Sequence, residues 1–182
     1  MSIEFTVTEQ DFVNFNVYHY EHSKKMKRTV RRMQVVMAIA LLIVFGYSGY
    51  TLGDSKGIVF FAVGVVATAV WIAFVPRYAR WNIRRTARKM LKRGGDNGFF
   101  GRHTVTLEDD GIREISASSS AYTEYSSVER IGYGYGNYYV YTGALQAFII
   151  PVSAFSGAEQ RQAFLNLLSE KTGVALGGGA WD

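Results

Sequence analysis

The chain has 182 residues, no cysteine, and a formal net charge of +5. The lack of cysteine excludes disulfides, iron–sulfur clusters, thiolate zinc sites and a cysteine nucleophile. Of the 20 Lys and Arg, 14 lie in residues 24–32 and 77–93, so the rest of the chain is acidic. Binding of nucleic acid is not expected, because it needs cations on the soluble domain itself.

A strand and a helix are predicted within residues 1–32. Ile3–Val7 alternates apolar and polar side chains, as a half-buried strand does. Thr8, with Asp11 three residues later, is a variant of the capping box that begins a helix. We expect this helix to bend near residues 21–24. We also expect the strand and helix to be cytosolic and to pack on the C-terminal domain, which is small for a core of its own.

Residues 33–75 contain two uncharged apolar runs, Met33–Leu52 and Gly57–Val75, of 20 and 19 residues. A helix rises about 1.5 Å per residue, so each run nearly reaches across the roughly 30 Å of bilayer hydrocarbon. Residues 53–56 join the runs. The pattern predicts a transmembrane hairpin. Two buried helices of a soluble protein are the alternative, and the absence of an amphipathic face disfavours them.

Cations crowd the outer flank of each run, whereas the loop between the runs holds Lys56 alone. Lys and Arg in short flanking segments stay on the cytoplasmic side, so both termini are expected in the cytoplasm. Juxtamembrane cations and an interfacial tryptophan are predicted to contact anionic lipid headgroups. These residues are Lys24, Lys25, Lys27, Arg28, Arg31, Arg32, Arg77, Arg80, Trp81, Arg84, Arg85 and Arg88.

Small residues in the two runs predict close helix packing in the membrane. The expected contact residues are Gly49, Gly64, Ala69 and Ala73. A homo-oligomer that pairs through Gly49 and Gly53 stays open as an alternative. Neither run carries an ionisable side chain, so transport by this chain alone is not expected.

Residues 76–98 are predicted to form a basic juxtamembrane helix that ends in a Gly-rich linker. Residues 99–172 then change to short strand-like runs followed by a last helix, with a capping box of Ser156 and Glu159. The runs are Arg102–Leu107, Gly111–Ser116, Ala121–Ser126, Val128–Tyr133, Tyr138–Thr142 and Leu145–Ile150. Residues 173–182 are expected to be a flexible tail.

The predicted fold class is therefore α+β. It combines a two-helix transmembrane hairpin with a small cytosolic antiparallel β domain that a C-terminal helix closes. Asp110-Gly111 and Gly136-Asn137 are the dipeptides expected at its hairpin turns.

The sequence predicts no catalytic residue, no cofactor and no metal site. His19 and His22 lie one helical turn apart, but no third ligand accompanies them, and a zinc site needs three or four. The serines near residue 118 lack a Gly-x-Ser-x-Gly elbow. Glycines at 132, 134 and 136 miss the phosphate-binding spacing, and no helix follows them.

One hairpin is unusually rich in tyrosine, a residue type that favours interfaces. Alternate residues of a strand face opposite ways, so one face of this hairpin is expected to be core and the other to bind a partner. The candidate partner surface comprises Tyr133, Tyr135, Tyr139 and Tyr141.

Three segments carry a recognisable pattern: IEFTVTEQDF at 3–12, GRHTVTLEDDGI at 101–112 and IIPVSAF at 149–155. They resemble the YcxB-like family of bacterial membrane proteins. The paired apolar runs between basic flanks match as well, so the resemblance spans nearly the whole chain. It implies a C-terminal domain similar to pleckstrin-homology (PH) barrels and a place in the bacterial cytoplasmic membrane. It transfers no catalytic motif.

We therefore expect a non-enzymatic, membrane-anchored interaction module that presents a PH-like domain at the cytoplasmic face. Its expected partners are the anionic bilayer and an unidentified protein. The alternative is an accessory or protective membrane subunit, of the toxin-immunity or transporter-associated kind, which recognises partners through its transmembrane helices.

Overall fold

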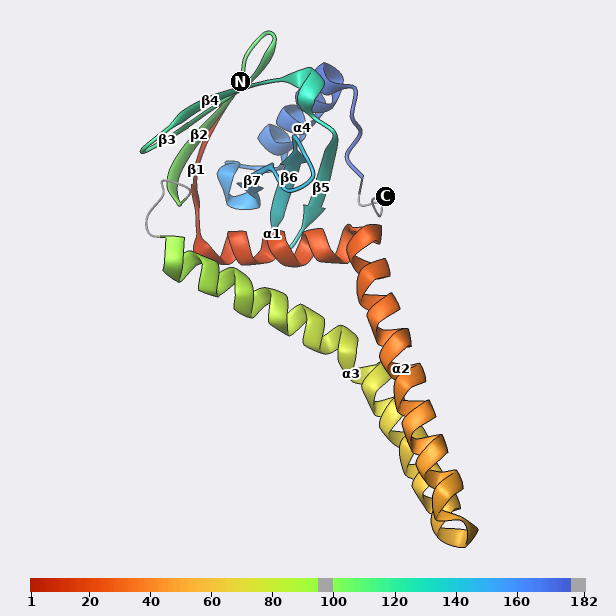
Figure 1. Cartoon of the computed structure of the whole chain (residues 1–182). Helices are drawn as coiled ribbons and strands as arrows, with labels where there is room; N and C mark the ends of the chain where they lie inside the picture. The colour runs from red at the N-terminus through yellow and green to blue at the C-terminus, as the bar shows by residue number, and fades with distance from the viewer. Residues whose placement is uncertain (95–99, 178–182) are drawn as a thin grey trace. The chain divides into compact units, whose positions relative to one another are not determined.

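The computed structural model describes residues 1–94 and 100–177. Long apolar helices precede two antiparallel sheets and a C-terminal helix, so the α+β fold class is confirmed (Figure 1). The chain divides into two compact units. Among the described residues, Met1–His22, 84–94 and 100–177 form the first, and Ser23–Ile83 forms the second.

The first unit contains a four-stranded antiparallel sheet in the order β1-β2-β3-β4. Its strands are β1 (Ser2–Val7), β2 (Gly101–Leu107), β3 (Gly111–Ser116) and β4 (Ser120–Glu124). The predicted third run continues past β4, but Tyr125–Ser127 forms a 3-10 turn instead of more strand.

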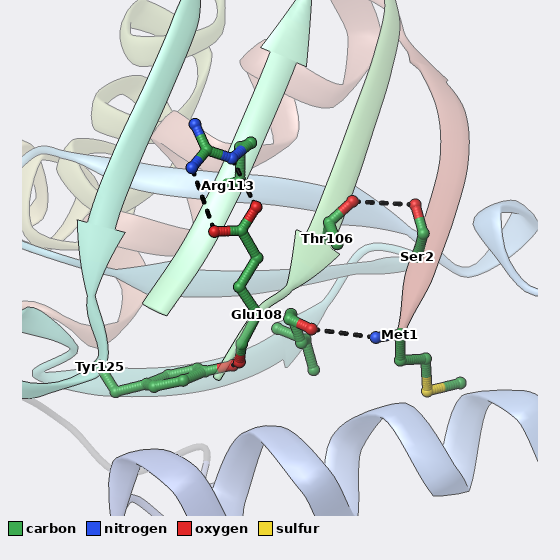
Figure 2. A network of polar contacts seen from close by, with 7 residues as sticks. Met1, Ser2, Thr106, Glu108, Arg113 and Tyr125 are labelled. Atoms are coloured by element: carbon green, nitrogen blue, oxygen red, sulfur yellow. Dashed lines mark hydrogen bonds and ion pairs between the residues drawn. The ribbon is translucent and has the colours of Figure 1, made fainter. Parts of the chain in front are cut away.

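Strand β1 pairs with β2 although about a hundred residues separate them in the chain. Ile3, Phe5 and Val7 point into the core while the residues between them are exposed, as the alternation predicted. The Met1 amino group donates to the Leu107 carbonyl at 2.9 Å (Figure 2). The first strand is thus held along its whole length.

Polar contacts fix the turn between β2 and β3. Arg113 donates from two guanidinium nitrogens to the Glu108 carboxylate, and the Tyr125 hydroxyl donates to the Glu108 carbonyl at 2.8 Å (Figure 2). The bidentate hydrogen bond from Arg113 lowers the pKa of the Glu108 carboxyl. This turn therefore stays charged and ordered at the end of the sheet.

The second sheet has the order β5-β6-β7. Its strands are β5 (Arg130–Gly134), β6 (Asn137–Tyr141) and β7 (Ala147–Pro151). The turn between β5 and β6 is Tyr135-Gly136, one residue earlier than the predicted dipeptide. Both residues have positive φ, 53° and 76°, as a type I′ turn requires. Asn137 instead belongs to β6 and is buried.

The core lies where the two sheets and α4 (Ala158–Thr172) meet. Phe164 and Leu168 of α4 are almost fully buried there. The predicted capping box at the start of α4 is wrong. Ser156 bonds the Gln160 side chain, through its backbone nitrogen at 2.7 Å and its hydroxyl at 2.9 Å, because the helix begins one residue later than the box requires.

Part of the expected flexible tail pairs with the second sheet. Leu176 forms a parallel bridge with Ile131, and the Gly177 backbone nitrogen donates to the Ile131 carbonyl at 3.0 Å. The predictions for residues 95–99 and 178–182 fall outside the described residues.

Three helices make up the N-terminal half: α1 (Glu9–His22), α2 (Lys24–Leu52) and α3 (Asp54–Gly94). The predicted cap is present, because Thr8 and Asp11 bond each other's backbone nitrogens at 2.9 and 3.2 Å. Ser23 separates α1 from α2, at the predicted bend. Gly53 alone, with a φ of +60°, separates α2 from α3.

Helices α2 and α3 approach closely in the second unit. A Cβ on Gly49 would lie 2.9 Å from the Gly57 carbonyl oxygen, and one on Gly64 would collide with the Phe45 side chain. Gly49 and Gly64 therefore lie at the contact between α2 and α3. Ala69 and Ala73 are exposed instead, because the contact stripe follows 57, 64, 68 and 75, and both alanines lie on another face.

Pro76 lies inside α3. Proline has no N–H, so the Ile72 carbonyl, four residues earlier, loses its helical donor. The Gln34 side chain of α2 donates to that carbonyl at 2.7 Å. A cross-helix hydrogen bond thus replaces the one that proline removes.

Candidate functional site

Helix α1 covers one face of the β5-β6-β7 sheet. Phe15 lies 5.7 Å from both Tyr139 and Tyr141 between ring centroids, and Tyr18 lies 4.6 Å from Tyr139. Tyr139 and Tyr141, both on β6, are 0% exposed. The prediction that Tyr139 and Tyr141 belong to the candidate partner surface is therefore wrong. Helix α1 of the same chain covers the face of the sheet on which they lie.

Two glycines of β5 make room for α1. A Cβ on Gly132 would lie 2.9 Å from Cζ of Tyr18, and one on Gly134 would lie 2.5 Å from Cδ2 of the same ring. Any side chain at either position would collide with Tyr18. Gly132 and Gly134 thus leave the space on β5 in which the Tyr18 ring packs.

A buried histidine belongs to the same interface. His19 is 9% exposed and lies 6.2 Å from the Tyr141 ring. Burial, and then the nearby charge of Arg130, lower the pKa of His19. Burial also raises the pKa of Tyr139 and of Tyr141. All three side chains are therefore held neutral at pH 7.

The accessible part of the predicted partner surface is the end of the β5–β6 hairpin. Tyr133 is 50% and Tyr135 is 44% exposed. The Tyr135 hydroxyl donates to the Glu21 carboxylate of α1 at 2.7 Å. The Tyr133 ring lies 4.8 Å from Tyr138. Two predicted residues thus stay on the surface, next to the end of α1.

The other histidines make structural contacts. Nδ1 of His22 lies 2.9 Å from the Tyr18 carbonyl oxygen. His103 is buried, contrary to the surface position that a strand start suggests, and its Nδ1 lies 3.0 Å from Glu114 Oε1. In the part of the chain that the structure describes, no group of three or more His, Cys, Asp or Glu could hold a metal ion.

The residues predicted to contact lipid headgroups lie on α2 and α3, and all twelve are exposed. Two further aromatic residues, Phe74 and Tyr78, lie beside this set on α3. Phe74 and Tyr78, with Arg77 and Trp81, line an open cavity of about 400 Å³. The i, i+4, i+7 spacing of the aromatic residues is the sequence signal that could have identified them.

Both long helices could cross a membrane by length and composition. Of the most apolar 18-residue window, only 6% is buried in α2 and 17% in α3. Such low burial differs from that of a core helix in a soluble protein.

The model of the YcxB-like protein family matches residues 107–168, from the end of β2 into α4. No curated protein and no solved structure matches the chain. The matched segment includes the last residue of β2 and all of β3 to β7. The resemblance to the YcxB-like family is therefore confirmed, over residues 107–168.

Proposed function

We propose that this chain is a two-span protein of the bacterial cytoplasmic membrane. The main support is the exposed apolar surface of α2 and α3. Ile43 is 64%, Ile58 is 73% and Val66 is 63% exposed. Soluble proteins rarely expose contiguous apolar patches larger than a few hundred Å². A bilayer would remove these side chains from water and supply the missing hydrophobic stabilisation.

We further propose that both ends of the chain lie in the cytoplasm. The cations cluster on the outer flanks of the two apolar runs, and residues 53–56 between the runs contain one lysine, Lys56. Two crossings return the chain to its starting side. The first unit, which is assembled from both ends of the chain, can fold only if those ends share a compartment.

The absence of cysteine makes this topology directly testable. We expect a membrane-impermeant maleimide to label Ser55→Cys in intact bacterial cells. Ser118→Cys, at an exposed turn of the first unit, should be labelled only after the membrane is permeabilised. Labelling of Ser118→Cys in intact cells, or recovery of the chain in the soluble fraction, would contradict the proposal.

We infer that the first unit acts as a non-enzymatic interaction module with a PH-like barrel. Its four-stranded and three-stranded antiparallel sheets and its C-terminal helix agree with the fold that the YcxB-like resemblance implies. Its histidines contact carbonyl, carboxylate or aromatic groups of the fold. These contacts favour binding over acid–base catalysis.

We propose the end of the β5–β6 hairpin as the protein-binding surface. Tyr135 adopts a φ of +53°, which is uncommon for a bulky residue and is often found at functional sites. Photo-crosslinkers placed at Tyr133 and at Tyr135 should capture the same protein in native membranes. Tyr122 of β4 is 46% exposed and serves as the matched control. Equal capture from all three positions, or capture from Tyr122 alone, would contradict the proposal.

The alternative function, recognition through the transmembrane helices, has less support. Gly49, Gly57 and Gly64, which would allow a partner helix to approach closely, already contact the opposite helix of the hairpin. Replacing the outward-facing apolar residues with other apolar residues should therefore leave partner capture unchanged.

A further inference from the structure

The cavity on α3 is lined by Phe74, Arg77, Tyr78 and Trp81 and has a volume of about 400 Å³. Its place in the sequence is informative. These residues bracket the end of the second apolar run, where the hydrocarbon gives way to the headgroups under the proposed topology. A role for this cavity at the membrane surface therefore rests on that topology.

The cavity wall is an aromatic stack. Phe74 and Tyr78 lie 5.7 Å apart between ring centroids with an interplanar angle of 27°, and Tyr78 lies 5.7 Å from Trp81. Each ring is about half exposed, with exposed fractions of 53%, 48% and 52%. Tyrosine and tryptophan rings are favoured at the headgroup level of a bilayer, because they combine an apolar body with a polar edge.

Arg77 supplies the charge. Its Nη1 donates to the Ala73 carbonyl at 3.1 Å, which holds the guanidinium against its own helix. That bond uses one of the five N–H donors of a guanidinium. No Asp or Glu occurs between Asp54 and Asp96, so the sequence around the cavity is entirely cationic. This charge and the aromatic wall suit an anion that has an apolar part.

A hydrogen bond to α2 also holds α3 in place next to the cavity. Gln34 bonds the Ile72 carbonyl that Pro76 leaves without a donor. The turn that carries Phe74 and Arg77 is thereby tied to α2. A braced turn needs less ordering when a ligand binds, and preorganisation of this kind favours affinity.

We infer that this cavity binds one anionic phospholipid. Arg77 donates to the lipid phosphate, and the Phe74, Tyr78 and Trp81 rings pack on the glycerol backbone and the first carbons of the acyl chains. The guanidinium suits phosphate because its N–H groups can bond two oxygens at once. The diffuse attraction of the other cations to the bilayer is a separate effect that does not require this geometry.

Brominated lipids quench nearby tryptophans and so test the site in the full chain. Trp71→Phe with Trp181→Phe leaves Trp81 as the reporter in phosphatidylcholine vesicles. We expect brominated phosphatidylglycerol to quench Trp81 at about fivefold lower mole fraction than brominated phosphatidylcholine. Fivefold corresponds to a binding preference of about 1 kcal/mol, since tenfold is about 1.4 kcal/mol.

Arg77→Gln should remove this preference, whereas Lys89→Gln, an equal loss of charge elsewhere on α3, should retain it. Equal quenching by the two lipids, or equal loss in both variants, would overturn the site. The companion reporter, Trp71 with Trp81→Phe and Trp181→Phe, should be quenched by both lipids alike. If Trp71 is not quenched, the topology itself fails; if it is quenched without a preference at Trp81, the site alone fails.

Discussion

The two units use the same apolar residue types in opposite ways. In the first unit Ile112 is 1% exposed, whereas Ile43 of the second unit is 64% exposed. Glycines also differ in use. Gly132 and Gly134 admit an aromatic ring to a sheet, while Gly49 and Gly57 let two helix backbones approach. The first unit buries its apolar side chains in its own core, whereas the second leaves them exposed, where a bilayer would cover them under the proposed topology.

The largest expected effect is a difference in stability loss between substitutions at Ile112 and at Ile43. We expect Ile112→Ala to lower the free energy of unfolding of the first unit by about 2–5 kcal/mol, because it leaves a cavity in a packed core. Ile43→Ala should change the stability of the full chain in detergent by less than about 0.5 kcal/mol. Chemical denaturation followed by circular dichroism measures both. Similar losses in the two variants would break the distinction between the units.

The second prediction concerns the packing of the Tyr18 ring against Gly132 and Gly134 of β5. Gly132→Ala should lower the free energy of unfolding by about 1–3 kcal/mol, because the new methyl group overpacks the interface between α1 and β5. Gly143→Ala is the control, since its Cβ would meet nothing closer than 3.6 Å. If the two substitutions lower the melting temperature equally, Tyr18 does not pack against Gly132.

A smaller effect is expected at Pro76. Gln34→Leu should destabilise the hairpin in detergent by about 0.6 kcal/mol and at most about 1.7 kcal/mol, the range of hydrogen bonds between transmembrane helices. In a Pro76→Ala background the same change should cost almost nothing, because the backbone N–H of residue 76 then serves the Ile72 carbonyl. Additive effects in this double-mutant cycle would show that Gln34 does not replace the missing donor.

The smallest effect is a pH dependence from His19. Because the folded pKa of His19 lies below its ordinary value, the unfolded chain takes up a proton first as the pH falls. The free energy of unfolding should therefore decrease as the pH falls through about 6.5, and should be unaffected by His19 above about pH 8. Denaturation between pH 5 and 8 measures this slope. His19→Phe should flatten it, and an unchanged slope would assign the dependence to other groups.

Local patterns accounted for most elements. Strand alternation predicted β1, the Thr8 cap predicted where α1 begins, and β3 has the predicted bounds. These features depend on neighbours within a few residues. Errors arose at turns, where a shift of one residue costs little locally. The dipeptide of the β5–β6 turn and the cap of α4 were each misplaced in this way.

The sequence by itself determined the element types and the two apolar runs, because period and length are local properties of the chain. Only the tertiary structure decided what covers the second sheet. Strand alternation gave Tyr139 and Tyr141 a common face, but no local signal connects that face to Tyr18, more than a hundred residues earlier. No local signal predicts the hydrogen bond between Gln34 and the Ile72 carbonyl either. Contacts between distant segments depend on the packing of whole elements, which short-range patterns do not specify.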